Sequence, residues 1–490
     1  MQNKTLFLPG FHLPTLRRKP RSAALILADQ RARLRQHSIT QLDECFGEFI
    51  PAKRLDHNQQ GSFSRRRLFS KSNTFWAFFS QVLDADGGCQ EVVRKIQAFA
   101  AGKSLTLPSA STSAYCQARQ KLDVTDLQGI LSHTSQQLDS RSQQAQHPIG
   151  RRVVVVDGSG LSMPDTVLNQ QRWPQLVSQK PGCGFPQARL SACFDLQTGA
   201  LLSHSLGNKK TNELPLFRQQ WSTFREGDVF LGDKAYCSYY DLWQLQQRGV
   251  DSVITLARRK PVDAAKATQV LGPDDVLIEW PKPQWNKVLS YSKETWRSLP
   301  EQLALRQIKV TVDVPGYRVK SFYLITTLLD SSAYSAKALA DLYLQRWDVE
   351  LFFRDIKTTM GMDVLRCKTP DMVTKEILMY LIAYNAIRLL MNNAGRSANL
   401  ARRQISFKAS VQALRQWEPA LSRQDVGSRE RRRLMAALYE AIIGNLLIER
   451  PGRHEPRCVK RRPKPYGLLT THRREMTEAP HRYRYRAKAA

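Results

Sequence analysis

Two short apolar runs, each followed by an aspartate, constrain the fold of this chain more than any other feature. One is Val153–Val156, directly before Asp157, and the other is Val229–Gly232, directly before Asp233. A short, uninterrupted apolar run bounded by turn residues predicts a strand that is buried on both faces. Two such strands predict an α/β sheet covered by helices, and the strand ends of an open α/β sheet are where chemistry is placed.

The segments around these two runs extend the predicted sheet. Residues 188–207 predict two strands around the turn "QTGA", and residues 250–257 and 321–329 predict two more strands. Helical spacing of apolar residues lies between them, at 214–224 and 239–249. This order predicts a mixed α/β sheet flanked by helices.

The character of the sequence divides the chain into five parts. We expect a helical N-terminal DNA-binding domain, a catalytic core in two parts, a mostly β insertion between those parts, and a basic C-terminal tail. The predicted boundaries are 1–150, 151–257, 258–319, 320–448 and 449–490.

The charge of the chain predicts a polyanionic partner. It has 490 residues with 74 Lys and Arg against 43 Asp and Glu, a formal net charge of +31. This excess favours nucleic acid first and an anionic membrane surface second. No apolar run reaches the roughly 18 residues that would span a bilayer, and no signal peptide is expected. The eight cysteines form no CxxC pair, so we expect a cytoplasmic protein without a zinc site or disulfide framework.

Basic clusters at both ends fit this partner. Arg65–Arg67 and a group at residues 17–21 punctuate the helical N-terminal part, and residues 450–490 hold 13 Lys or Arg against three Asp or Glu. Each N-terminal cluster taken alone is also what a solvated helix face would carry. The tail is expected to be extended or partly ordered and to bind a polyanion.

Asp157 and Asp233 each have a structural explanation and a functional one. Asp157 in "DGSG" could be a turn residue, and Asp233 in "GDKAY" could cap a helix. Together, at the ends of two buried strands, they resemble the paired carboxylates of a metal-dependent phosphoryl-transfer site. A third carboxylate is then expected from a helix beside the sheet.

A predicted helix over residues 336–357 offers that third carboxylate. Tyr343, Arg346, Glu350 and Lys357 fall within roughly 60° of one another on a helical wheel. The apolar residues of the same helix lie along a neighbouring face. A solvated stripe of charge pairs would give the same pattern, but such a stripe would also direct Glu350 into the crevice of the sheet.

The order Asp157, Asp233 and then Tyr343-x2-Arg346-x3-Glu350-x6-Lys357 resembles the DDE transposases of the insertion-sequence-four family. The contexts "VVVVDGSGLSMPDT", "VFLGDKAYCS" and "RWDVELFFRDIKTTMGMDVLRCKTP" are similar to the segments of that family that carry its three acids. The resemblance covers at least residues 151–393. It implies an RNase H-like core in which the long interval between Asp233 and Glu350 holds a β insertion.

The resemblance implies an enzyme that cuts DNA at the ends of an insertion sequence and joins the 3′-hydroxyl ends to target DNA. Asp157, Asp233 and Glu350 would be both catalytic residues and metal ligands. Two Mg²⁺ ions, which Mn²⁺ can replace, suit such hard oxygen ligands. The partners implied are terminal inverted repeats, target DNA and a second copy of the chain in a paired-end complex.

The other signature residues would hold DNA beside the cut. Arg346 and Lys357 would contact phosphates next to the active site, and Tyr343 would contact the terminal phosphate. Such contacts position the backbone without reading its sequence. The family also suggests a hairpin intermediate in which a flipped terminal base stacks on a tryptophan, with Trp280, Trp285 and Trp296 as the candidates.

Two alternatives stay open from the sequence. One is a structure-selective nuclease with an RNase H-like core and no strand transfer. The other is a DNA-binding protein descended from a transposase that no longer catalyses a reaction. The sequence leaves undetermined the terminal repeat, the target preference, the formation of hairpins, the N-terminal helix that contacts DNA, and whether this copy is active.

Overall fold

The computed structural model describes most of the chain, and the gaps are short apart from the two ends. The described residues are 46, 49–56, 58–65, 67–102, 106–142, 147–208, 211–256, 261–286, 291–312, 321–421, 428–447 and 472. The basic cluster at 17–21 and nearly all of the basic tail lie outside them.

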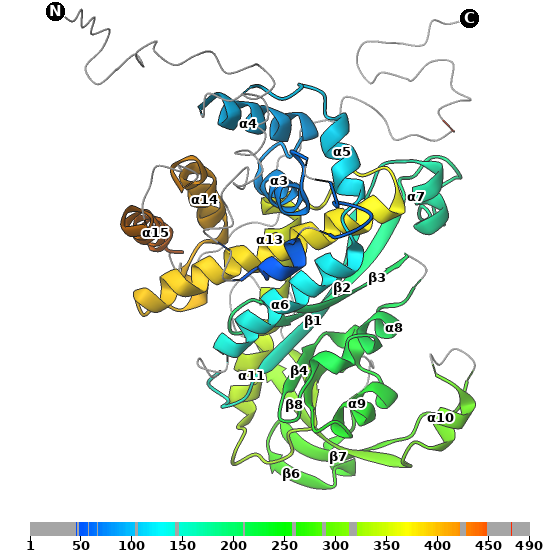
Figure 1. Cartoon of the computed structure of the whole chain (residues 1–490). Helices are drawn as coiled ribbons and strands as arrows, with labels where there is room; N and C mark the ends of the chain where they lie inside the picture. Colours follow the sequence, from blue (N-terminus) through cyan, green and yellow to red (C-terminus); the bar gives the residue numbers. More distant parts are fainter. Residues whose placement is uncertain are drawn as a thin grey trace, which may run out of the picture.

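The centre of the molecule is a sheet that, in the described part, has nine strands in the order β3-β2-β1-β4-β5-β9-β8-β7-β6 (Figure 1). The strands are β1 Val153–Ser162, β2 Gln187–Asp195, β3 Leu201–Asn208, β4 Val229–Gly232, β5 Asp251–Thr255, β6 Gln269–Gly272, β7 Asp275–Pro281, β8 Gln302–Thr311 and β9 Ser321–Thr326.

The first five strands have the RNase H-like topology. β1, β2 and β3 form an antiparallel meander, and β4 and β5 run parallel to β1 on its other side. The predicted mixed α/β sheet and RNase H-like core are therefore confirmed. This topology brings the end of β4 next to the middle of β1, although the two strands are separated by a long stretch of sequence.

The β1 run is apolar without alternation because both faces of the sheet are covered. Val153 and Val155 belong to the core under one helical layer, and Val154 and Val156 belong to the core under the other. All four side chains are at most 2% exposed. Burial on both faces is the condition under which a strand loses its period-two pattern.

Helices cover both faces of this sheet. In chain order, the α-helices of the described residues are α3 Lys71–Leu83, α4 Cys89–Gly102, α5 Ser113–Gln120, α6 Val124–Ser142, α7 Val167–Arg172, α8 Glu213–Arg218, α9 Tyr239–Gln246, α10 Lys293–Arg297, α11 Ala336–Leu344, α12 Asp348–Arg354, α13 Pro370–Ser397, α14 Phe407–Leu421 and α15 Ser428–Ile443.

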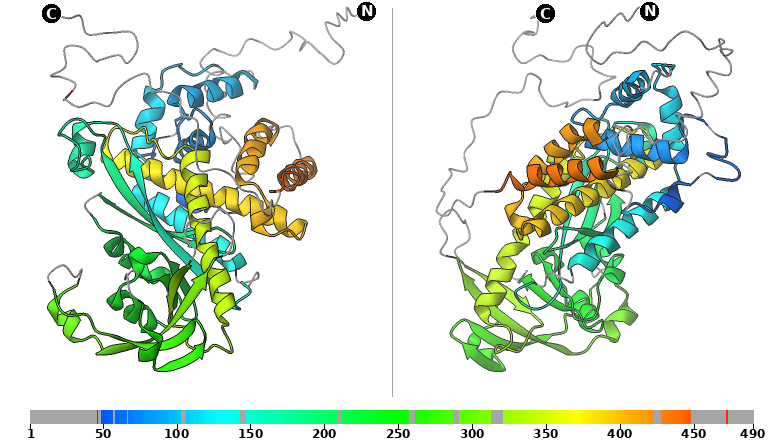
Figure 2. Two further views of the ribbon diagram at one scale, coloured as in Figure 1. Left: turned by 180° about the vertical axis from the view of Figure 1, so that it is seen from behind. Right: turned by 60° about the vertical axis from the view of Figure 1, so that its left-hand side comes forward.

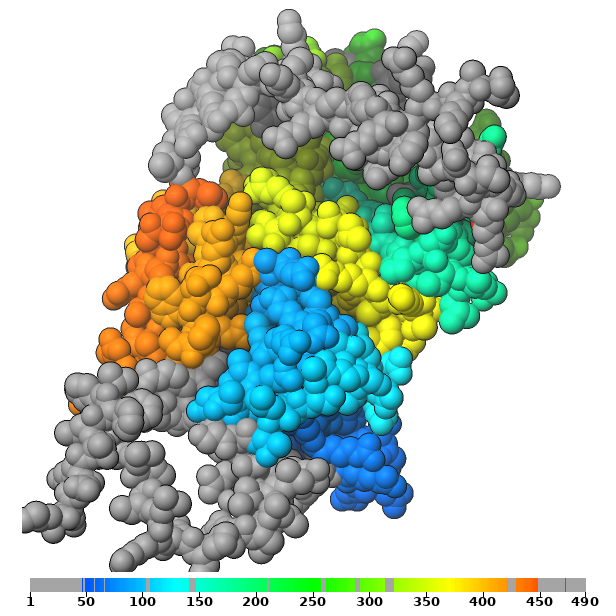
Figure 3. Space-filling view, turned by 90° about the horizontal axis from the view of Figure 1, so that it is seen from above, coloured from blue at the N-terminus to red at the C-terminus, as the bar shows by residue number. Residues whose placement is uncertain are grey.

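The long helix α13 organises one side of the molecule. It packs against α6 and β3 toward the sheet and against α3, α14 and α15 on its outer side (Figure 2). Figure 3 shows α3–α5, α13 and the α14–α15 pair as neighbouring bodies on one face. α8 and α9 cover the opposite face of the sheet, where Phe217, Phe230 and Leu242 are fully or nearly fully buried.

The inserted β segment extends the central sheet. β9 pairs antiparallel with β5, and β8, β7 and β6 follow in turn. The segment expected to be mostly β does contain β6, β7 and all of β8, together with the short helix α10. The five-part division of the chain stays a prediction.

The structure corrects the expectation that Asp157 ends its strand. β1 continues to Ser162 because β2 pairs with it along nearly its whole length, including Asp157 with Ala192 and Gly158 with Ser191. β4, in contrast, pairs only with Val153–Val155. Asp157 therefore lies in mid-strand, directly past the point at which its parallel neighbour leaves the sheet.

The structure also corrects the single helix expected over residues 336–357. α11 ends at Leu344, a 3₁₀ turn, η5, spans Gln345–Trp347, and α12 is followed by a π-helical segment, η6, at Asp355–Thr359. The turn tightens the helix and the π segment widens it, so a uniform rotation per residue does not hold along it. π segments in helices often occur at functional sites.

Candidate active site

Asp157 is the most shielded acid of the predicted set. Its Oδ1 atom accepts a 2.7 Å hydrogen bond from the backbone N–H of Gly158. Burial raises the pKa of Asp157 to about 6; the Gly158 N–H opposes this, while the negative charge of Asp233 adds to it. Burial and the neighbouring acid therefore both disfavour the anionic form of Asp157.

Asp233 follows β4 and caps the short 3₁₀ turn η3, Lys234–Tyr236. Its Oδ1 atom accepts a 2.8 Å hydrogen bond from the backbone N–H of Ala235. The cap interpretation of Asp233 is thus correct, whereas Asp157 lies within β1 and is not a turn residue. Each of these hydrogen bonds uses only one carboxylate oxygen, and within the described residues no hydrogen bond engages Oδ2 of either acid.

Arg346 lies beside this pair of acids. Its positive charge lowers the pKa of Asp157, and its side chain is only 9% exposed. The guanidinium group stacks on the ring of Trp347, with 4.8 Å from Cζ to the ring centroid. Its buried Nε–H has no hydrogen-bond partner within the described residues. A buried donor without a partner is costly, so this atom is available for an anionic ligand.

Glu350 lies outside the pair of acids. Its side chain is 52% exposed, and its Oε1 atom is 3.9 Å from Nη2 of Arg346. Among the described residues, no three His, Cys, Asp or Glu side chains are close enough to hold a metal ion. The structure therefore brings Asp157 and Asp233 together, and it holds Glu350 against Arg346.

Tyr343 and Lys357 reach the same edge of the sheet from the two ends of the signature segment. The Tyr343 hydroxyl is hydrogen-bonded to the Thr255 hydroxyl at the end of β5. Nζ of Lys357 donates a 3.0 Å hydrogen bond to Oγ of Ser159 on β1. The signature segment thus runs along the sheet from β5 to β1.

Two residues near Asp157 were not expected from the sequence. Glu213 begins α8, and its Oε1 atom is only 3.0 Å from the position that a Cβ atom would take at Gly158. Tyr236 has a buried hydroxyl without a hydrogen-bond partner in the described residues, and burial followed by the charge of Asp157 raises its pKa. No spacing rule in the sequence signals either residue, because the packing of α8 and of the turn η3 brings them to the site.

The three candidate tryptophans of the insertion have different environments. Trp280 is 8% exposed and packs edge-on against Tyr239 in the core. Trp296 donates a 2.7 Å hydrogen bond from Nε1 to the carbonyl of Pro283, and Trp285 lies half-buried beside it. Trp280 is thus held in the core, while Trp285 and Trp296 keep part of their surface accessible.

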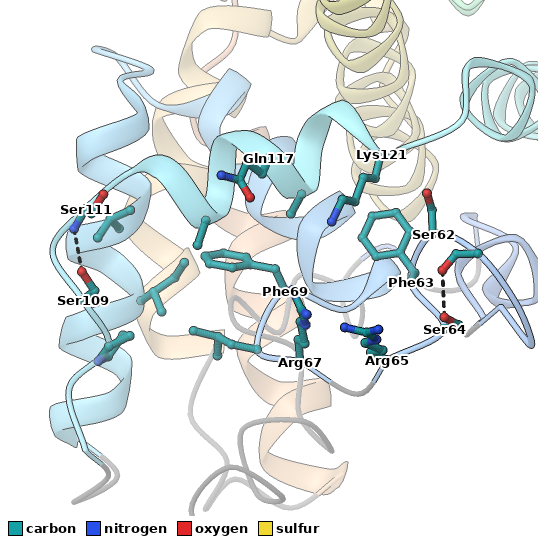
Figure 4. Close-up of a pocket in the computed structure, with 17 residues that line it drawn as sticks. Ser62, Phe63, Ser64, Arg65, Arg67, Phe69, Ser109, Ser111, Gln117 and Lys121 are labelled. Carbon is teal, nitrogen blue, oxygen red and sulfur yellow. Dashed lines mark hydrogen bonds between the residues drawn. The ribbon is translucent and has the colours of Figure 1, made fainter.

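The N-terminal helical part contains a groove between α5 and the loop before α3. Its volume is about 550 Å³, and Arg65, Arg67 and Lys121 line it together with several serines. Figure 4 shows Arg65 and Arg67 side by side, with Lys121 extending toward them from the end of α5. None of the three cations has an ion-pair partner within the described residues. The predicted Arg65–Arg67 cluster therefore borders a cavity.

Comparison with known proteins identifies the class of this chain. Residues 148–386 match the family model of the transposase DDE domain. The transposase InsG for insertion sequence element IS4 of Escherichia coli K12 is 25% identical over 410 residues, covering 82% of this chain and 88% of that protein. The probable transposase for insertion sequence element IS5377 of Geobacillus stearothermophilus is 28% identical over 134 residues, 26% of this chain and 34% of that protein.

One solved structure is similar over most of its length. It is a piggyBac transposase synaptic complex with hairpin DNA, and the match covers 87% of each chain with 12% identity and a TM-score of 0.38. At that score the match does not by itself establish a common fold.

The fold, the two adjacent acids and the domain match define this chain as a DDE transposase. Within that class it belongs to the insertion-sequence-four family, whose signature it carries at Tyr343, Arg346, Glu350 and Lys357. No helix in the described part of the chain is long and apolar enough to cross a membrane.

Proposed function

We propose that this transposase cleaves DNA at the ends of an insertion sequence and transfers the resulting 3′-hydroxyl ends to target DNA. The observation that carries the proposal is the pairing of β1 with β4, which aligns Asp157 and Asp233 on neighbouring parallel strands. The sequence-specific substrates would be the terminal inverted repeats of the element.

The donor chemistry of the site fits Mg²⁺, with Mn²⁺ able to replace it. Asp157 and Asp233 each keep one oxygen outside their local hydrogen bonds, and hard cations prefer carboxylate oxygen. We propose that these two acids and Glu350 hold two ions. When bound, such ions activate the attacking oxygen and stabilise the leaving oxygen of an in-line displacement.

Glu350 must leave Arg346 to complete this set. We propose that it turns toward Asp157 when a DNA phosphate takes its place beside the guanidinium group. Two observations support this: the Glu350 side chain is half exposed, and the buried Nε–H of Arg346 has no partner within the described residues. A phosphate would satisfy that donor and release the glutamate.

Arg346, Lys357 and Tyr343 would hold the DNA backbone on both sides of the cut. Their support is their position along the edge of the sheet, where Lys357 reaches Ser159, two residues beyond Asp157. In the first step a water molecule attacks the phosphodiester bond and the 3′-oxygen leaves as a hydroxyl. In the second step that hydroxyl attacks a target phosphodiester, so no covalent protein intermediate is needed.

A hairpin intermediate would require a stacking surface for a flipped base. Of the three tryptophans, the half-buried Trp285 and Trp296 are supported by their accessible surface, whereas Trp280 is held in the core. Base stacking on an aromatic ring offsets the cost of unstacking that base.

The N-terminal part would bind the terminal repeat through the groove shown in Figure 4. Arg65, Arg67 and Lys121 provide three cations at one end of the cavity, and serine hydroxyl groups are among its other lining groups. Cations and hydroxyl groups are the usual contacts to DNA phosphates. We propose that a homodimer holds two ends together on the DNA in the bacterial cytoplasm.

The test is an incubation of the protein with duplexes that carry candidate element ends, target plasmid and Mg²⁺, followed by a denaturing gel. Nicked, hairpin and joined products separate on this gel. Joined products support the proposal. Nicked products alone, with no joining at any target concentration, would indicate the alternative, an RNase H-like nuclease without strand transfer.

A further inference from the structure

A second basic pocket lies beside the helix that carries Glu350. Its volume is about 690 Å³, and it is enclosed by α12, the π segment η6, the 3₁₀ turn η7 (Arg402–Gln404), and α14. Asp348, Phe352 and Asp355 line it from the signature segment, so the pocket and the candidate active site share one helix.

The charges around this pocket are strongly unbalanced. Six cationic side chains line it and only two acidic ones, Asp348 and Asp355. The cations are Arg354, Arg388, Arg402, Arg403, Lys408 and Arg415.

Both acids are already engaged. Oδ2 of Asp348 accepts hydrogen bonds of 2.6 Å from Arg402 and 2.9 Å from Arg403, and Oδ2 of Asp355 accepts one of 2.6 Å from Arg388. Arg354 and Lys408 are exposed and have no ion-pair partner within the described residues. The mouth of the pocket therefore carries positive charge that no carboxylate in the described part of the chain neutralises.

The floor of the pocket also carries guanidinium groups. Those of Arg388 and Arg402 both stack on the ring of Phe352, at 5.2 and 4.9 Å from its centroid. Burial, and then the charge of Arg388, lower the pKa of Arg402. Asp348 and Asp355 balance only part of the six cations around the pocket, so an anion in the pocket would be stabilised.

We propose that this pocket binds phosphate groups of the DNA backbone, with the exposed Arg354 and Lys408 as the contacting residues at its mouth. The inference rests on the proposed function and extends the DNA path beyond the active site. DNA is favoured over an isolated acidic side chain because the pocket continues along α12 from Glu350, one helical turn before Arg354. DNA held at the scissile phosphate would bring its neighbouring phosphates to this surface.

The test compares the double variant Arg354→Ala/Lys408→Ala with a matched double variant, Lys337→Ala/Arg248→Ala. The control removes the same number of charges from two exposed sites outside the pocket. Binding is measured by fluorescence anisotropy at several salt concentrations, with end duplex and unrelated duplex as separate probes. We expect roughly tenfold weaker binding for the pocket variant and a salt dependence smaller by about two released ions.

Neutralised DNA locates the phosphates that the pocket binds. Replacing the phosphates one by one with uncharged methylphosphonates should weaken DNA binding by the wild-type protein at the positions that the pocket contacts. The same replacements should not weaken DNA binding by the pocket variant any further. Weaker binding of the end duplex alone would assign the pocket to the element end, and weaker binding of the unrelated duplex alone would assign it to target DNA. Unchanged affinity and salt dependence for both probes, in a variant with wild-type thermal unfolding, would overturn the inference.

This result is separable from the proposed function. Nicking of the end duplex at saturating protein concentration reports on the acids and not on the pocket. If the pocket variant binds weakly but still nicks once bound, the pocket assignment stands. If wild-type protein binds DNA through the pocket and never nicks or joins it, the proposed function fails and the pocket remains.

Discussion

Asp157 on β1 lies level with Asp233, which directly follows the neighbouring parallel strand β4. β1 pairs Val155 with Leu231 of β4, and each aspartate follows two residues later. Adjacent strands lie about 4.8 Å apart, so the two acids lie near each other. Their mutual repulsion contributes to the raised pKa of Asp157. The sheet therefore creates a site for positive charge at this point.

Asp157→Asn and Asp233→Asn should each lower the rate of DNA nicking by about 10³-fold or more. The amide keeps the size of the side chain but removes the anionic oxygen ligand. Binding of the end duplex should change by no more than roughly threefold. Single-turnover nicking and anisotropy on the same preparations measure the two effects. Wild-type nicking by either variant would falsify the assigned role.

Glu350 and Asp348 provide a matched pair of acids on one helix. Glu350→Gln should abolish nicking and change the free energy of unfolding by no more than about 0.5 kcal/mol, since its side chain is half exposed. Asp348→Asn should lower the free energy of unfolding by about 2 kcal/mol, because Arg402 and Arg403 would no longer share an acid. Denaturant unfolding and nicking assays separate the roles. The assignment is wrong if Glu350→Gln nicks normally.

Lys357→Ala should change the ratio of joined to nicked products. Its ammonium group lies at Ser159 on β1, beside the acids, and should hold a phosphate next to the cut. We expect joining to fall several-fold more than nicking. Lys337→Ala, which removes an exposed lysine from α11, is the control. An equal product ratio in the two variants would contradict this role of Lys357.

The N-terminal groove should account for part of the salt dependence of end binding. Replacing Arg65, Arg67 and Lys121 with alanine should lower the slope of log affinity against log salt by about 0.9 for each phosphate that is no longer neutralised. Arg94→Ala, on the exposed face of α4, is the control for a single charge. Salt titrations by anisotropy measure the slope. A slope equal to that of wild-type protein would remove the groove from the DNA path.

Two copies of the chain should assemble when two element ends are present. Pairing of ends needs two DNA-binding units and two active sites, so the complex is expected to contain a dimer. Light scattering after size-exclusion chromatography, with and without end duplex, gives the mass of the complex. A monomer mass on DNA that carries both ends would contradict this expectation.

The sequence alone determined the strands of the core and the family. The unbroken apolar runs at Val153–Val156 and Val229–Gly232 predict strands buried on both faces, because only such strands lose polar alternation. The signature spacing identifies Arg346, Glu350 and Lys357 as one set. The spacing could not predict that η5 and η6 interrupt the helix. These interruptions depend on packing against distant segments, as in the hydrogen bond from Arg388 to Asp355.

Tertiary structure decided which of these residues meet. The pairing of β1 with β2 places Asp157 in mid-strand, and the pairing of β1 with β4 places it beside Asp233. Packing also brought Glu213 to Gly158 and left Glu350 at Arg346. Local patterns report burial and periodicity along the chain, whereas strand register and loop paths depend on contacts between distant segments. For that reason the sequence named the acids, and only the fold showed which two of them already share a site.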